Sequence, residues 1–153
     1  MAENFVVSRR QTIAAQPEAV FEKIVDLREW GQWSPWDELD PDMNKTFSGD
    51  PGSVGAGYHW TGNRKVGEGR MTMTEIDAPN RVAIDLEFLK PFKSQSVTEL
   101  LVAAEGDGSE VTWTMTGPNT LMTRIMGIFR SMDKMVGPDF EKGLASLKRI
   151  VES

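Results

Sequence analysis

The C-terminal stretch from Ser131 to about Glu152 predicts one long amphipathic helix, and its apolar side has to be covered. Its apolar residues are Met132, Val136, Phe140, Leu144, Leu147 and Val151. This spacing of three or four places them on one stripe of a helix. Gly137-Pro138 predicts a kink or short break within it. No helical pattern of comparable length precedes it, so we expect the helix to lie against the concave face of an antiparallel sheet.

Strand-like runs provide that sheet. We predict strands over residues 5–13, 44–48, 56–61, 68–77, 81–89, 94–104 and 110–116. Turn residues such as Gly62-Asn63 and Gly106-Asp107-Gly108 separate the later runs, as expected for consecutive hairpins. Short helices are predicted from Pro17 and from Arg28 to Trp33, and a short helix or turn over 121–129. The prediction is a single α+β domain over residues 1–153.

Composition excludes several functional classes. A net charge of −6 with dispersed Lys and Arg argues against nucleic acid as a partner. The absence of cysteine excludes thiolate metal sites, and one histidine excludes a histidine-rich one, so neither metal nor cofactor is expected. No stretch approaches the roughly 20 apolar residues of a membrane span, and the N-terminus lacks a signal-peptide pattern. We therefore expect a cytoplasmic protein, as a monomer or homodimer.

Alternation along the strands predicts an almost wholly apolar inner face, because successive strand residues point to opposite sides of a sheet. Methionine is frequent, with nine residues, and its flexible side chain suits a lining that adapts to varied apolar ligands, although it fills an irregular core equally well. The residues predicted to line a ligand cavity are Trp36, Trp60, Met71, Met73, Phe88, Leu100, Trp113, Met115, Met122, Met126, Met132, Val136 and Phe140.

Three of the five tryptophans lie in the segment from Trp30 to Trp36. Large aromatic side chains bury much apolar surface, so this segment is expected to anchor the fold. It is interpreted as a packed lid over one end of the core or as an aromatic wall of a ligand pocket.

Two residues are candidates for acid–base chemistry. Strand parity places Glu75 on the inner face with Met71 and Met73, where burial would raise its pKa and make it a proton donor or a polar anchor. The alternative is a position at the rim, in contact with arginine or water. Tyr58 shares the inner face with Trp60, which sends His59 outward and leaves no inward histidine to activate a serine.

Several segments, taken in order, resemble one protein family. They are Trp33-Ser34-Pro35-Trp36, Asp40-Pro41, Trp60-Thr-Gly62-Asn63, Phe88-Leu-Lys-Pro91, Val111-Thr-Trp113-Thr-Met-Thr-Gly117 and Asp139-Phe140-Glu-Lys-Gly143-Leu144. From about residue 5 to 150 the chain resembles the polyketide cyclase/dehydrase-like branch of the START-related SRPBCC superfamily. The resemblance implies a helix-grip fold: a seven-stranded antiparallel sheet curled around a long C-terminal helix, two short helices at one end, and a hydrophobic cavity.

This fold hosts carriers, cyclases, hydrolases and regulatory modules, so the family alone does not specify function. With few polar residues facing inward, we expect the chain to bind a hydrophobic small molecule, such as a lipid, a polyketide-like compound or an aromatic metabolite. The alternatives are an enzyme of cyclase or dehydratase type and a protein-interaction module without a small ligand.

Overall fold

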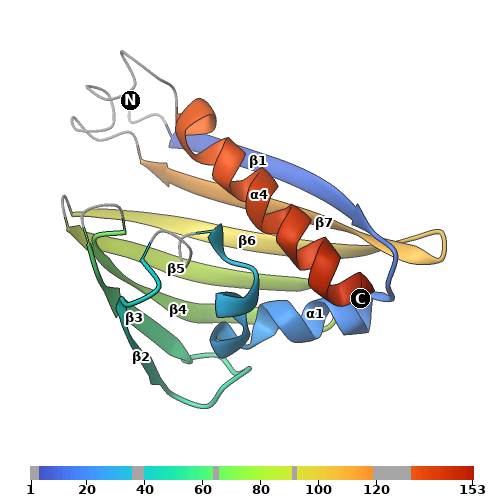
Figure 1. Ribbon diagram of the computed structural model, residues 1–153, viewed down its shortest axis with the longest axis horizontal. Coiled ribbons are helices and arrows are strands. Elements are labelled where there is room, and N and C mark those ends of the chain that lie inside the picture. Colours follow the sequence, from blue (N-terminus) through green and yellow to red (C-terminus); the bar gives the residue numbers. More distant parts are fainter. Residues whose placement is uncertain (1–3, 36–39, 64–65, 91–92, 119–131) are drawn as a thin grey trace.

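Seven antiparallel strands form one curved sheet in the computed structural model, which describes residues 4–35, 40–63, 66–90, 93–118 and 132–153 (Figure 1). The elements are β1 Asn4–Ile13, α1 Pro17–Val25, the 3₁₀ helix η1 Leu27–Gln32, β2 Asn44–Ser48, β3 Gly57–Thr61, β4 Glu68–Asp77, β5 Arg81–Lys90, β6 Ser94–Glu105, β7 Gly108–Pro118 and α4 Met132–Glu152. The strand order is β1-β7-β6-β5-β4-β3-β2. The predicted α+β helix-grip architecture is confirmed, and the predicted helix over 121–129 lies outside the described residues.

The helix α4 runs along β1, at the half of the sheet that β1 and β7 form, while β2, β3 and β4 form the other half (Figure 1). Its stripe is buried through Phe140, Leu144 and Leu147, each at most 1 % exposed. Of the two alternatives at Gly137-Pro138, the short break is wrong, because the helix is continuous from Met132 to Glu152, and the kink stays a prediction. Proline removes only one backbone hydrogen bond, and burial of the stripe holds the turns that follow it.

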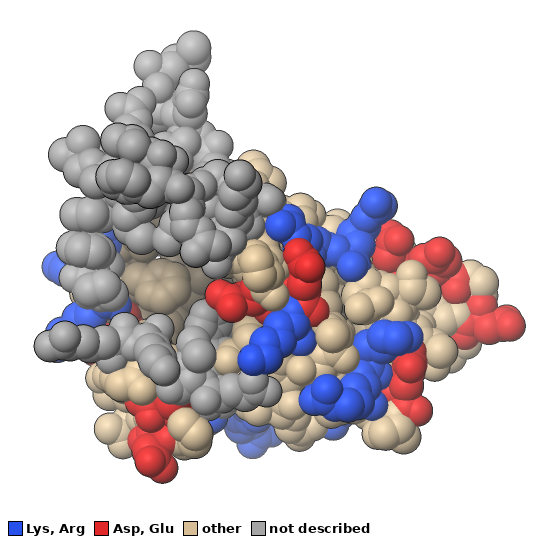
Figure 2. Space-filling view, turned by 45° about the horizontal axis from the view of Figure 1, so that its top comes forward, with Lys and Arg blue, Asp and Glu red and all other residues tan. Residues whose placement is uncertain are grey.

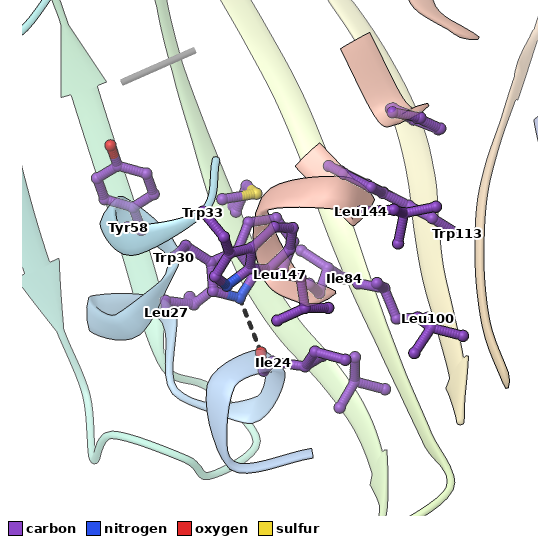
Figure 3. Close-up of a cluster of buried hydrophobic side chains, with 14 of the residues drawn as sticks. Ile24, Leu27, Trp30, Trp33, Tyr58, Ile84, Leu100, Trp113, Leu144 and Leu147 are labelled. Atoms are coloured by element: carbon purple, nitrogen blue, oxygen red, sulfur yellow. Dashed lines mark hydrogen bonds between the residues drawn. The ribbon is translucent and has the colours of Figure 1, made fainter. Parts of the chain in front are cut away.

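The tryptophans of the η1 region form a packed lid. Trp30 and Trp33 are 3 % and 2 % exposed, and their Nε1 atoms donate hydrogen bonds to the carbonyl oxygens of Ile24 (2.8 Å) and Lys23 (3.0 Å). Both rings contact Trp113 of β7, with centroids 5.9 and 5.4 Å away, and Figure 3 shows this cluster beside Leu144 and Leu147 of α4. The lid interpretation is confirmed for these two residues, and Trp36 lies outside the described residues.

Candidate functional site

The strand register arranges the inner face of the sheet in rows that cross several strands. The deep row is Val82, Leu100 and Trp113. The middle row is Met73, Ile84, Thr98 and Met115. The first rim row is Tyr58, Met71, Leu86 and Ser96. The second rim row is Trp60, Gly69, Phe88 and Ser94.

Burial decreases from the deep row to the rim rows. Val82, Leu100 and Trp113 are at most 1 % exposed. In the rim rows Leu86 and Phe88 are only partly buried, although both belong to the inner face and pack against the core. The inner face therefore opens toward the end of the sheet where β5 finishes and β6 begins.

Aromatic rings form much of this open end. The Trp60 ring contacts Tyr58, with centroids 5.7 Å apart, and meets Phe88 edge-on at 5.6 Å. The Trp60 Nε1 atom donates a 2.9 Å hydrogen bond to the Val66 carbonyl oxygen, so the indole has a fixed orientation. Gly69 makes room for the ring, since a Cβ atom there would lie 2.5 Å from the Trp60 ring. Together these residues present a rigid aromatic wall.

The residues predicted to line a cavity divide between core and rim. Those at most 1 % exposed are Met73, Leu100, Trp113 and Phe140. Those nearer the surface are Trp60, Met71 and Met115, at 5 to 8 %, and the partly buried Phe88 and Val136. Trp36, Met122 and Met126 and the side chain of Met132 lie outside the part that the structure describes. The first group forms packing contacts, so the second group contains the better candidates for ligand contacts.

The inward orientation predicted for Glu75 is wrong. The β4–β5 register shifts between Met73 and Glu75, as in a β-bulge at Thr74, and the extra residue reverses the parity of the strand beyond it. Ile76 takes the inner position, whereas the Glu75 side chain is 64 % exposed and accepts a 3.3 Å hydrogen bond from Arg81 Nη2. Glu75 therefore lies at the exposed end of β4 beside Arg81, as the alternative interpretation expected. The proposed catalytic role of Glu75 depended on its burial on the inner face, and the side chain is not buried there.

Tyr58 and His59 take the faces that the alternation predicts. Tyr58 is 8 % exposed within the first rim row. His59 faces the other side, where its Nε2 atom lies 2.8 Å from Glu68 Oε2. A catalytic role for Tyr58 stays a prediction.

Sequence reasoning placed Thr98 on the inner face but proposed none of three inward polar residues as part of a site. Ser96 and Thr98 are 7 % and 3 % exposed, and both share the parity of the buried Leu100, which was the available signal. Arg9 shares the parity of the buried Val7 and lies beneath α4. Its Nε atom donates a 2.8 Å hydrogen bond to Glu141, so α4 supplies the countercharge.

Two carboxyl groups outside these rows, those of Asp26 and Asp139, have shifted pKa values, and neighbouring groups or burial explain each shift. Hydrogen bonds from Arg28 lower the pKa of Asp26, the residue that caps η1. Burial raises the pKa of Asp139 on α4, against a smaller opposing effect of Lys142. On the face of the molecule drawn in Figure 2, basic and acidic residues are interspersed over the described part of the surface.

The chain was compared with protein families, with curated proteins and with solved structures. A model of the family described as polyketide cyclase/dehydrase and lipid transport matches residues 4–152. Comparison with curated proteins gives no match. Among the described helices, none combines the length and apolar character needed to cross a membrane.

Solved structures share the fold at low sequence identity. Protein CV1439 from Chromobacterium violaceum is 13 % identical with a TM-score of 0.69, and 97 % of each chain is covered. The Mll3558 protein from Rhizobium loti is 21 % identical with a TM-score of 0.69, covering 97 % of this chain and 98 % of that one. The Aha1 dimer from Colwellia psychrerythraea is 16 % identical with a TM-score of 0.63, covering 97 % and 96 %.

Likenesses at this level of identity establish the fold and leave function to the residues of the site. The family match spans almost the whole chain, and the long helix, the seven-stranded sheet and its order agree with the resemblance drawn from the sequence. The chain belongs to the polyketide cyclase/dehydrase and lipid transport family.

Proposed function

We propose that this protein binds a hydrophobic small molecule on the two rim rows, between the sheet and α4. The observation that carries the proposal is the partial exposure of Leu86 and Phe88, two inward-facing apolar side chains next to fully buried rows. Partly exposed apolar side chains that share one concave face with fixed aromatic rings are typical of sites for apolar ligands.

The chemistry of the rim rows supports the same proposal. Trp60 and Phe88 offer flat apolar surfaces, while Met71 offers a side chain that adapts to ligands of different shape. The family description, which names lipid transport as well as polyketide cyclases and dehydrases, is compatible with such a ligand. A lipid, a polyketide-like compound or an aromatic metabolite would each find apolar contacts here.

Native mass spectrometry of freshly purified protein, followed by organic extraction, tests the proposal. We expect a co-purifying apolar compound or, for protein stripped by the extraction, uptake of added prodan, a dimethylaminonaphthalene that carries a propionyl group. Phe88→Ser should lower the bound fraction several-fold, because it replaces an aromatic contact with a hydroxyl group. Its matched control is Val97→Ser, at an outer-face residue that is 46 % exposed, and this variant should retain the ligand.

Two results would contradict the proposal. One is wild-type protein that carries no apolar compound and takes up no prodan. The other is equal retention of the ligand by Phe88→Ser and by the wild type, because the rim rows would then contribute nothing to binding.

A further inference from the structure

We propose that the hydroxyl groups of Ser96 and Thr98 form a hydrogen-bonding site for an uncharged polar group of the ligand, a carbonyl or a hydroxyl. This inference rests on the proposed function, because it assumes that an apolar molecule occupies the rim rows. It adds the chemical class of that molecule: a largely hydrophobic ketone, ester or alcohol rather than a pure hydrocarbon or an ion.

The two residues lie side by side on the inner face. They are two positions apart on β6 and belong to its buried parity, with 7 % and 3 % of their surface exposed. Ser96 is paired with Leu86 on β5, which is one of the partly exposed residues of the first rim row. Thr98 is paired with Met115 on β7. The hydroxyl pair therefore lies where the rim meets the middle row.

Neither side-chain hydroxyl has a hydrogen-bond partner among the residues that the structure describes. Other hydroxyls near the sheet are satisfied: Ser109, at 0 % exposure, donates a 2.7 Å hydrogen bond to the Ala15 carbonyl oxygen, and Thr74 donates one of 3.0 Å to that of Ala83. Neither hydroxyl oxygen belongs to the fully buried side-chain atoms without a partner in the described part of the chain, so both oxygens remain accessible to a ligand atom. A ligand oxygen that bonds to Ser96 and Thr98 would use this free hydrogen-bonding capacity.

The surroundings favour an uncharged group. On the inner face of the described parts of β3 to β7, no lysine, arginine, aspartate or glutamate is present. Arg9 lies on β1 and is engaged by Glu141 of α4. A carboxylate or ammonium group placed beside Ser96 would be buried without a countercharge from these described strands, which is costly. A carbonyl oxygen can instead accept hydrogen bonds from both hydroxyls.

Two probes of nearly the same shape separate this inference from the proposed function. Prodan has the ketone, and its analogue with a propyl group in place of the propionyl group lacks it. Fluorescence titration of wild type, Ser96→Ala, Thr98→Val and the double variant measures Kd for each probe. The matched control is Thr112→Val, on the outer face of β7.

We expect each single variant to weaken prodan binding about 5-fold, the usual contribution of one neutral hydrogen bond, and the double variant to weaken it further. The propyl analogue should bind all proteins alike, and Thr112→Val should bind both probes as the wild type does.

Unchanged prodan binding by the double variant, with the propyl analogue also bound, would overturn this inference and leave the proposed function standing. Equal loss of both probes in the double variant would overturn it too, because the effect would then not come from the carbonyl. Failure of the wild type to bind either probe, in protein that also carries no co-purifying apolar compound, would overturn the proposed function and this inference with it.

Discussion

Replacing Trp113 with alanine is expected to lower the free energy of unfolding by about 3–5 kcal/mol, the usual range for a large aromatic side chain removed from a core. Trp113 is 1 % exposed and stacks on Phe140 of α4, with ring centroids 4.1 Å apart. It also contacts both tryptophans of the lid. The ring thus joins the sheet, the long helix and η1, and its loss weakens all three contacts at once.

Urea unfolding followed by circular dichroism measures this change without relying on tryptophan fluorescence. The control is Trp113→Phe, which keeps an aromatic ring beside Phe140 and should recover part of the lost stability. A cost below about 1 kcal/mol for Trp113→Ala would contradict the packing described here, because it would mean that the site collapses without losing contacts.

Two adjacent leucines of β6 give the second large effect. Leu100→Ala should lower the free energy of unfolding by about 2–5 kcal/mol, because this side chain is fully buried in the deep row. Leu101→Ala should cost no more than about 1 kcal/mol, because Leu101 faces the other side and is 38 % exposed. The chemical change is identical, so the difference reports which face of the strand is inside.

Chemical denaturation of both variants in parallel gives the comparison. Equal costs at the two positions would show that the outer face of β6 is also covered, and a larger cost at Leu101 would reverse the orientation of the strand. Either result would contradict the assignment of the rows.

Much of the fold follows from the sequence because its elements are regular. The spacing from Met132 to Val151 predicted a helix from Ser131 to about Glu152, and the described helix α4 runs from Met132 to Glu152. Turn residues predicted the hairpins of the sheet, and alternation predicted the faces of β5, β6 and β7. These patterns predict the structure correctly where a strand or helix keeps its regular period without an inserted residue.

The failures occur where a local irregularity or a tertiary contact decides. The bulge at Thr74 turned Glu75 outward, and alternation cannot reveal an extra residue within a strand. Gly137-Pro138 suggested a break, but burial of the stripe keeps α4 continuous. Arg9 faces inward because Glu141 of α4 meets it, a contact between residues far apart in sequence.

The sequence predicted which residues face inward, but it did not predict which of these inward residues remain partly exposed. Parity selected Leu100 and Phe88 alike as inward residues, and nothing in the sequence separates the buried leucine from the partly exposed phenylalanine. That distinction depends on where α4 runs across the sheet, which is set by packing against β1. Ser96 and Thr98 became candidates only after their burial beside the partly exposed rim rows was known.

The most direct test of binding on the rim rows is a titration of protein labelled at the methionine methyl groups with the propyl analogue of prodan, followed by NMR. Resonances are assigned by single Met→Ile substitutions. We predict that the methyl signals of Met71, in the first rim row, and of Met115, in the middle row, shift with one common Kd. Binding that leaves both the Met71 and Met115 signals unchanged would contradict a ligand site on this face of the sheet.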